Sequence, residues 1–292
     1  MSRRIRMAVR GGSPLRNALA YPSVAVAAGM LLASLVLTLL VPLLPGFDPY
    51  SQQLSNGMVA PFHQWAHPLG TDPLGRDMLS RLALAGRGSA MIALLALSLN
   101  MAVGVVLGLV AGYFGGAVEA VIMGVADLQV SIPIMMLLVM VVAVAGHSVV
   151  TLVLLLGLAY WVGYGRVARL MALSLRERDF VLAARTFGAS NFWILSRHLF
   201  PQLLPQLAIM GSFDLGVMVI IECGLSYLGL GVQLPAPSWG GLIAEGQDFL
   251  QVDPWLCILP GIAIWFLVGA VQILSQHLTN VRQGRRPRKQ AA

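Results

Sequence analysis

The sequence has 292 residues, of which 58% are hydrophobic and only 11% are charged. A water-soluble domain carries about a quarter charged residues, so this chain has too few to cover a soluble globule, and its mean hydropathy of +0.80 points to a membrane protein. The net charge is +7, yet the only lysine is Lys289, which excludes an ATP-binding P-loop within this sequence.

Six apolar runs are long enough to cross a bilayer, because a spanning helix needs about 20 mostly apolar residues. We therefore expect an all-α membrane protein. The first run follows an arginine-rich segment, but its apolar core is longer than that of a signal peptide and no small-residue cleavage site follows it, so we expect an uncleaved anchor. The expected spans are residues 23–44, 89–112, 117–145, 148–166, 205–226 and 255–276.

The basic residues predict the orientation, because cytoplasmic loops of membrane proteins carry an excess of Lys and Arg. Three of them, Arg76, Arg81 and Arg87, lie in predicted exterior segments. The other sixteen lie in, or directly beside, the segments predicted on the opposite side of the membrane, which include the N-terminal segment. We therefore expect both termini in the cytoplasm. A nucleic-acid surface is the alternative explanation for the positive charge, but the chain shows no binding motif and no aromatic residues interleaved with the basic ones.

Two predicted exterior segments are rich in Pro and Gly, which indicates turns. In residues 45–88 we expect turns and then, from Asp77, a short amphipathic helix that leads into the second span. In residues 227–254 we expect turns that end at Asp253 and Pro254. These two residue types suit the N-cap and first position of the last span.

The predicted interior loop, residues 167–204, is charged and has a helical pattern. Its first helix places Phe180, Val181, Ala184 and Phe187 near one face. We expect Gly188 to end this helix, Ser190 to cap a second one, and Pro201 and Pro205 to end that. The apolar face must pack on the protein's own bundle or receive a cytosolic partner.

Sequence motifs in this loop are specific. The stretch A-A-R-T-F-G-A-S at residues 183–190, followed by R-H-L-F-P at 197–201, resembles the EAA loop of ABC importer permeases. Leu182 stands where that pattern has Glu, and His198 and Phe200 replace its Ile and Leu. These departures resemble the peptide-transporter branch of the family.

Two exterior motifs strengthen the resemblance. H-P-L-G-T-D-P-L-G-R-D-M-L-S-R at residues 67–81, and L-S-Y-L-G-L-G at 225–231 with P-A-P-S-W-G at 235–240, are similar to blocks of that branch. The resemblance covers about residues 20–280 and identifies the chain as a C-type permease subunit of the dipeptide, oligopeptide and nickel ABC transporters. It implies a six-helix type I importer subunit with a cytoplasmic coupling loop.

The resemblance also implies what the chain binds. The coupling turn would sit in a groove of a separate ATPase subunit, so ATP and Mg²⁺ would belong to partners and this chain would hold no cofactor. The implied partners are a second homologous permease, two ATP-binding subunits, an extracytoplasmic substrate-binding protein and the lipid of the bacterial plasma membrane, with no nucleic acid. The implied coupling residues are Ala183, Ala184, Arg185, Gly188, Ala189, Ser190 and Pro201.

The substrate that the resemblance implies is a di- or oligopeptide, with nickel, glutathione or another peptide-like or sugar-type solute as the alternative. The expected organisation has four parts. These are a basic cytoplasmic tail at 1–22, the first span with the exterior segment at 23–88, a five-helix core at 89–280 that contains the loop 167–204, and a basic tail at 281–292.

Three acidic residues fall within predicted spans. For Asp214 two interpretations stay open, a group that lines the transport route or a structural partner inside the bundle. For Asp127 and Glu222 we favour a structural role, because they lie nearer span ends, where a charged group can reach water. No nucleophile or metal-ligand set accompanies them, which argues against a membrane enzyme, and a stand-alone channel would not need the interior loop.

Other candidate sites have simpler explanations. His63 and His67 have the spacing of a metal pair, but residue 64 is Gln, so the H-E-x-x-H pattern is absent. His147 and Ser148 lie in a short turn with no G-x-S-x-G elbow. Cys223 and Cys257, both in apolar runs, argue for neither a disulfide framework nor a zinc site. A face of small residues for helix packing is predicted at Gly104, Gly108 and Gly112.

Overall fold

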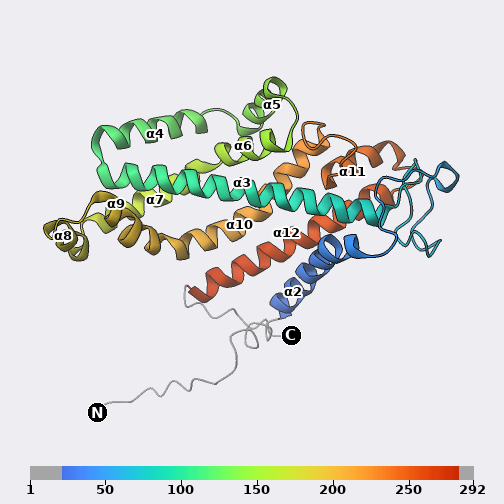
Figure 1. Ribbon diagram of the computed structural model, residues 1–292, viewed down its shortest axis with the longest axis horizontal. Coiled ribbons are helices and arrows are strands. Elements are labelled where there is room, and N and C mark those ends of the chain that lie inside the picture. The colour runs from blue at the N-terminus through green and yellow to red at the C-terminus, as the bar shows by residue number, and fades with distance from the viewer. Residues whose placement is uncertain (1–21, 283–292) are drawn as a thin grey trace, which may run out of the picture.

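The computed structural model describes residues 22–282, and helices joined by turns make up this part of the chain (Figure 1). The predicted tails therefore lie almost entirely outside the described residues. The α-helices are α2 Pro22–Leu35, α3 Met78–Phe114, α4 Gly116–Val130, α5 Ile134–Ala145, α6 Val149–Ala159, α7 Trp161–Arg176, α8 Asp179–Thr186, α9 Asn191–Ile194, α10 Phe200–Tyr227, α11 Trp239–Gly246 and α12 Trp255–Arg282. Short helical turns are η1 Val36–Leu40, η2 Val41–Leu43, η3 Leu54–Asn56, η4 Leu195–Leu199 and η5 Gln247–Phe249.

Five helical segments are long and apolar enough to cross a membrane, and a bent pair of helices would make a sixth if the pair is counted as one span. This confirms the predicted all-α membrane fold. The five segments are Pro22–Leu43, Met78–Phe114, Val149–Arg176, Asn191–Tyr227 and Trp255–Asn280.

The prediction of one straight span over residues 117–145 is wrong. Helices α4 and α5 meet at an angle of 90°. The break falls at residues 131–133, where Pro133 has no N–H for the helix ladder and disfavours a helical conformation at Ile132. The Ser131 hydroxyl closes the end of α4 by donating to the Asp127 carbonyl at 2.8 Å. Proline at this position was therefore a stronger signal than the continuous apolar run.

The second span begins earlier than residue 89, because the helix predicted from Asp77 is continuous with it. Helix α3 is one helix of 37 residues, about 55 Å long at 1.5 Å per residue. Its N-terminus is capped by Asp77, whose Oδ2 accepts from the Ser80 N–H at 2.8 Å. Since a hydrocarbon core is about 30 Å thick, α3 is long enough to reach past the bilayer.

The fifth span also starts earlier than predicted. Helices α9 and α10, joined by η4, form one continuous segment from Asn191 to Tyr227. Neither proline ends it. Pro201 lies just after the π-helical turn η4, and Pro205 is accommodated inside α10.

The predicted small-residue face is where α3 packs on α7. A Cβ atom at Gly108 would lie 2.2 Å from the Gly165 carbonyl oxygen, and one at Gly104 would lie 2.5 Å from the Trp161 carbonyl oxygen. Gly112 meets the Arg169 carbonyl oxygen in the same way. Only glycine lets the two backbones approach this closely, so this face confirms the packing interpretation.

The loops separate to the two ends of the molecule. In Figure 1, α8 and α9 lie at the left end, whereas residues 45–77 and α11 lie at the right end. Between the ends, α12 packs on α2 and on α10. The two segments predicted to be exterior therefore share one end, opposite the loop predicted to be cytoplasmic. The last helix begins as predicted, because Asp253 Oδ1 accepts from the Trp255 N–H at 3.2 Å.

Candidate functional site

The turn between α8 and α9 has the expected stop and cap. Gly188 has a φ of +81°, a conformation that favours glycine. The Gly188 N–H donates to the Arg185 carbonyl at 2.9 Å and the Ala189 N–H donates to the Ala184 carbonyl at 3.0 Å, which is a Schellman motif. The Ser190 hydroxyl then accepts from the Trp193 N–H at 3.3 Å and starts α9. Small residues thus make a tight turn that ends one helix and begins another.

The C-terminal end of α3 holds this turn in place. The Tyr113 hydroxyl donates to Asn191 Oδ1 at 2.8 Å and accepts from Arg185 Nε at 3.3 Å. The Arg185 guanidinium lies 4.8 Å from the centre of the Tyr113 ring, within cation–π distance. Below the turn, Val181 and Ile194 are fully buried. The turn is therefore part of the bundle rather than a loose loop.

The tip of the turn carries large apolar side chains that remain exposed. Phe187 is 89% exposed and Phe192 is 80% exposed, and Leu182 is also exposed. We call these three residues the loop patch. Of the apolar face predicted for α8, Val181 is buried in the bundle, whereas Phe187, the residue after the helix, is exposed and open to a partner. Large apolar side chains left exposed on a tight turn are suited to contact with a protein partner.

The other residues predicted for coupling lie around this patch. Ala184 and Ala189 pack against the core, whereas Ala183, Arg185, Gly188 and Ser190 are exposed. Pro201 is also exposed, but it lies in the first turn of α10. The structure thus brings the residues at 183–190 together in one turn and places Pro201 on the helix that follows.

At the opposite end, two arginines and two carboxylates form a network that sequence reasoning missed. Arg81, at 2% side-chain exposure, donates through Nη1 to Asp72 Oδ2 at 2.6 Å and through Nη2 to Glu245 Oε2 at 2.9 Å. Arg76 donates through Nε to Asp72 at 2.6 Å and through Nη2 to Glu245 at 2.9 Å. The network joins the motif at 67–81 to α11. The pair of arginines in that motif could have indicated such a network, but the sequence analysis used them only to predict the orientation in the membrane.

A tryptophan completes the attachment of α11. Trp239 is fully buried, and its Nε1 donates to the Leu82 carbonyl at 3.0 Å. A Cβ atom at Gly86 would lie 2.5 Å from the Trp239 ring, and one at Gly240 would lie 2.0 Å from the Cys223 carbonyl oxygen. Helix α11 is therefore wedged between α3 and α10. The close contacts of Trp239 and Gly240 give a steric reason for the W-G pair in the motif.

The histidines of the exterior segment have separate surroundings. His67 Nδ1 lies 3.1 Å from Asp77 Oδ1, next to the cap of α3, and His63 is exposed. Within residues 22–282, no group of three or more His, Cys, Asp and Glu side chains is arranged to hold a metal ion.

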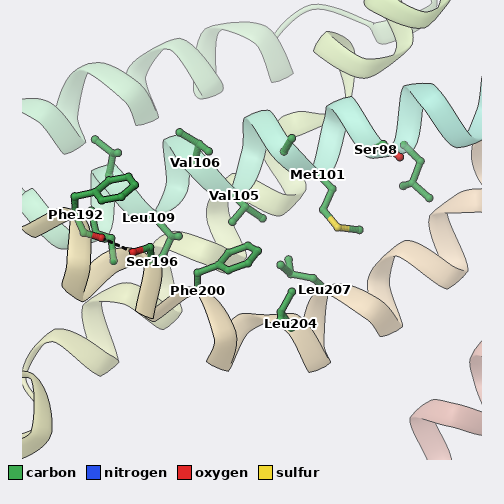
Figure 2. A pocket seen from close by; sticks show the side chains of 14 residues that line it. Ser98, Met101, Val105, Val106, Leu109, Phe192, Ser196, Phe200, Leu204 and Leu207 are labelled. Atoms are coloured by element: carbon green, nitrogen blue, oxygen red, sulfur yellow. Dashed lines mark hydrogen bonds between the residues drawn. The ribbon is translucent and has the colours of Figure 1, made fainter. Parts of the chain in front are cut away.

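A groove of about 620 Å³ runs between α3 and the α9–α10 segment (Figure 2). Its walls are apolar, with Phe192, Phe200 and Met101 among them. The hydroxyls that border it are already satisfied, since Ser98 donates to the Leu94 carbonyl and Ser196 donates to the Phe192 carbonyl, both at 2.7 Å. Two serine hydroxyls that already donate within their helices are the polar side-chain groups of this lining, so a hydrophilic solute would lose most of its hydrogen bonds there.

The acidic residues within the spans differ from one another. Asp214 is half-buried, accepts from the Tyr164 hydroxyl at 2.6 Å, and borders a polar cavity. Asp127 is exposed and pairs with Arg166 at 2.8 Å. The expectation that Glu222 reaches water near a span end is wrong, because Glu222 is fully buried and accepts from the Ser226 hydroxyl at 2.8 Å. The structural role expected for Glu222 stays a prediction, now based on its burial inside the bundle.

Comparison with known proteins identifies the family. Residues 104–280, more than half of the chain, match the family described as binding-protein-dependent transport system inner membrane component. The chain belongs to this family of permeases.

Similar permeases have assigned transport systems. The chain is 34% identical to the nickel transport system permease protein NikC of Escherichia coli (strain K12), over 80% of this chain and 83% of that protein. It is 32% identical to the probable D,D-dipeptide transport system permease protein DdpC of the same organism, over 83% and 81%. It is 31% identical to the oligopeptide transport system permease protein OppC of Haemophilus influenzae, over 81% and 76%. The chain is thus a multi-pass ABC importer permease of the peptide and nickel group, with the type I fold.

The family match covers two of the three features described above. The loop patch and Asp214 lie within residues 104–280 of the permease, whereas Asp72, Arg76 and Arg81 precede this range. The permease thus has a turn with exposed apolar residues at one end, a charged network at the other end and a polar cavity between them.

Proposed function

We propose that this permease forms half of the pathway by which an ATP-driven importer moves di- or oligopeptides into the cell. The observation that carries the proposal is the turn between α8 and α9, which exposes an apolar patch yet is fixed to α3 through Tyr113. Similarity to the D,D-dipeptide and oligopeptide permeases supports a peptide as the substrate. Nickel is the second candidate, because the nickel permease NikC is also similar, at 34% identity.

The loop patch docks on a separate ATPase subunit, which binds ATP and Mg²⁺. Because α9, η4 and α10 are one continuous segment, a force on the turn is transmitted directly along a spanning helix. The hydrogen bond between Tyr113 and Asn191 passes the same displacement to α3. Closure of two ATPase subunits would thereby rock the bundle and alternate its access, as in other two-state transporters.

The remaining partners follow from the two ends of the molecule. A second homologous permease supplies the other half of the pathway. An extracytoplasmic binding protein delivers the substrate to the end formed by residues 45–77 and α11. With the turn in the cytoplasm, as the distribution of basic residues favours, both termini are cytoplasmic in the bacterial plasma membrane.

The test compares two glycines with the same backbone conformation. Gly188 in the turn and Gly146 between α5 and α6 both have a φ of +81°, and neither has an atom within 4 Å of an added Cβ. We expect Gly188→Trp to abolish co-purification of the ATPase subunits and ATP hydrolysis stimulated by the binding protein. Gly146→Trp carries the same backbone strain and should retain both. ATPase binding that survives Gly188→Trp contradicts the proposed coupling site.

The substrate is tested in proteoliposomes that contain the complete complex and its binding protein. Uptake of radiolabelled trialanine supports the peptide assignment, and uptake of radioactive nickel alone supports the second candidate. Uptake of trialanine or nickel without any ATPase subunit contradicts the proposed function as a whole.

A further inference from the structure

A cavity of about 550 Å³ lies where the bent pair α4–α5 meets α3, α7 and α10. Its walls include polar side chains from four different helices, and we call it the polar cavity. These side chains are Asn100 of α3, Gln129 of α4, Tyr164 of α7 and Asp214 of α10. The cavity lies within the spanning segments, where polar side chains are costly and usually face a water-filled space or the interior of the bundle.

Asp214 has no cationic partner in the part of the chain that the structure describes. Its Oδ2 accepts the Tyr164 hydroxyl at 2.6 Å, and no ion pair to it is formed within residues 22–282. Arg166 also borders the cavity, but it is paired with Asp127 at 2.8 Å. One hydrogen bond leaves most of the accepting capacity of the carboxylate unused, since two oxygens offer about four lone-pair sites.

Asn100 is a second unused polar group in the same wall. It is 1% exposed, and neither its amide nitrogen nor its amide oxygen has a hydrogen-bond partner. Buried amides are almost always satisfied, so an unsatisfied one calls for a partner that the chain itself does not supply. Gln129 differs, because it donates to the Ala159 carbonyl at 2.6 Å and accepts from Trp161 Nε1 at 2.8 Å.

The polar lining continues past Asp214. A further cavity of about 430 Å³ between α10 and α12 is also bordered by Asp214 and by Met210, together with Ser275 and Thr279. Asp214 therefore lies where two polar cavities meet on α10. The groove in Figure 2 differs, since its lining includes no charged side chain.

We propose that the polar cavity is a transit site for a cation, with Asp214 as the counter-charge. The Tyr164 hydroxyl orients the carboxylate. The α-ammonium group of a peptide and a nickel ion share the chemistry that a carboxylate recognises. The proposal rests on the function proposed above, because it requires the chain to form part of an import pathway.

The charge of the cavity can be measured without knowing the substrate. In the complete complex, Cys223 and Cys257 are replaced by Ala and a single reporter is introduced as Met210→Cys, which borders both cavities. The reporter is treated with a cationic trimethylammonium-ethyl and an anionic sulfonatoethyl methanethiosulfonate reagent. We expect the cationic reagent to react about tenfold faster, relative to a free thiol in solution, because a charged cleft concentrates ions of opposite sign.

Two further variants identify the source of this preference. Asp214→Asn should abolish it, whereas Asp248→Asn, which removes an exposed carboxylate that borders neither cavity, should leave it intact. Equal rates for both reagents with Asp214 present overturn the proposal. So does a reporter that reacts with neither reagent, since the cavity would then be closed to aqueous ions.

Transport completes the test and separates the two cations. Uptake of trialanine and of radioactive nickel is measured separately, and Asp214→Asn should reduce whichever uptake the wild-type complex supports by about tenfold. Unchanged uptake in that variant overturns the transit role. A wild-type complex that imports neither probe contradicts the substrate assignment of the previous subsection, while the reagent experiment still decides whether the cavity attracts cations.

Discussion

Arg81 and Asp72 form a buried ion pair, with Nη1 2.6 Å from Oδ2 and side-chain exposures of 2% and 3%. The pair joins the first turn of α3 to the exterior segment before it, and Glu245 extends the contact to α11. Removing one member of a buried pair leaves the other charge uncompensated, which costs more than the pair itself contributes. The network therefore fixes the geometry of this end of the permease.

Replacement of Arg81 by Met should destabilise the permease by about 3 kcal/mol, the lower end of the cost of breaking a buried pair, because Arg76 would remain as one positive charge for the two carboxylates Asp72 and Glu245. The measurement is the thermal unfolding midpoint of the detergent-solubilised complex. Arg87→Met is the matched control, since Arg87 lies on the same helix but is exposed, and surface changes are usually within about 0.5 kcal/mol. Equal midpoints for the two variants would show that the network does not stabilise this end.

Replacement of Tyr113 by Phe should weaken coupling rather than assembly. The change removes the hydroxyl that donates to Asn191, a bond that contributes about 0.5–1.5 kcal/mol, and keeps the ring under Arg185. We expect ATPase subunits to remain bound while the amount of substrate imported per ATP falls severalfold. Tyr227→Phe, which deletes a similar 2.6 Å hydrogen bond to Gln247 at the opposite end, should leave this ratio unchanged. A normal ratio in Tyr113→Phe would exclude this route of transmission.

Replacement of Phe187 by Ala should lower the affinity for the ATPase subunit by about 2 kcal/mol or more, the size of an aromatic hot spot. Because Phe187 is 89% exposed, the stability of the permease itself should not change. Phe62, which is 86% exposed at the other end, provides the control as Phe62→Ala. Binding of the purified ATPase subunit to each variant is measured by titration. Equal affinities would remove Phe187 from the docking surface.

Local chemistry explains what the sequence predicted well. The glycine stop at Gly188, the serine cap at Ser190 and the cap of the last helix at Asp253 all depend on a residue and its immediate neighbours. The apolar runs identified the spans for the same reason. Two of the errors concern proline. The prediction passed over Pro133, which breaks an apolar run, and took Pro205, which is accommodated inside a spanning helix, as a helix end.

The features that the sequence did not predict depend on long-range contacts. Glu245 lies far from Arg81 along the chain, so only the fold reveals that they pair. The same holds for Asn100 and Asp214, which border one cavity from α3 and α10. Nothing in the local pattern of Glu222 distinguishes a buried carboxylate from one that reaches water, because the distinction depends on which helix face packs inward.

The contact between α3 and α7 gives the last prediction. A Cβ atom at Gly108 would lie 2.2 Å from the Gly165 carbonyl oxygen and 2.8 Å from the Ala168 side chain, so Gly108→Ala must push the helices apart. We expect a loss of about 1–3 kcal/mol, the usual cost of overpacking, seen as a lower thermal unfolding midpoint of the solubilised permease. Gly124→Ala on α4 is the control, since nothing lies within 4 Å of its added Cβ, and the better helix propensity of Ala should leave the midpoint unchanged or raise it slightly. If the Gly108→Ala and Gly124→Ala variants have the same unfolding midpoint, α3 and α7 do not pack as closely as this face of glycines requires.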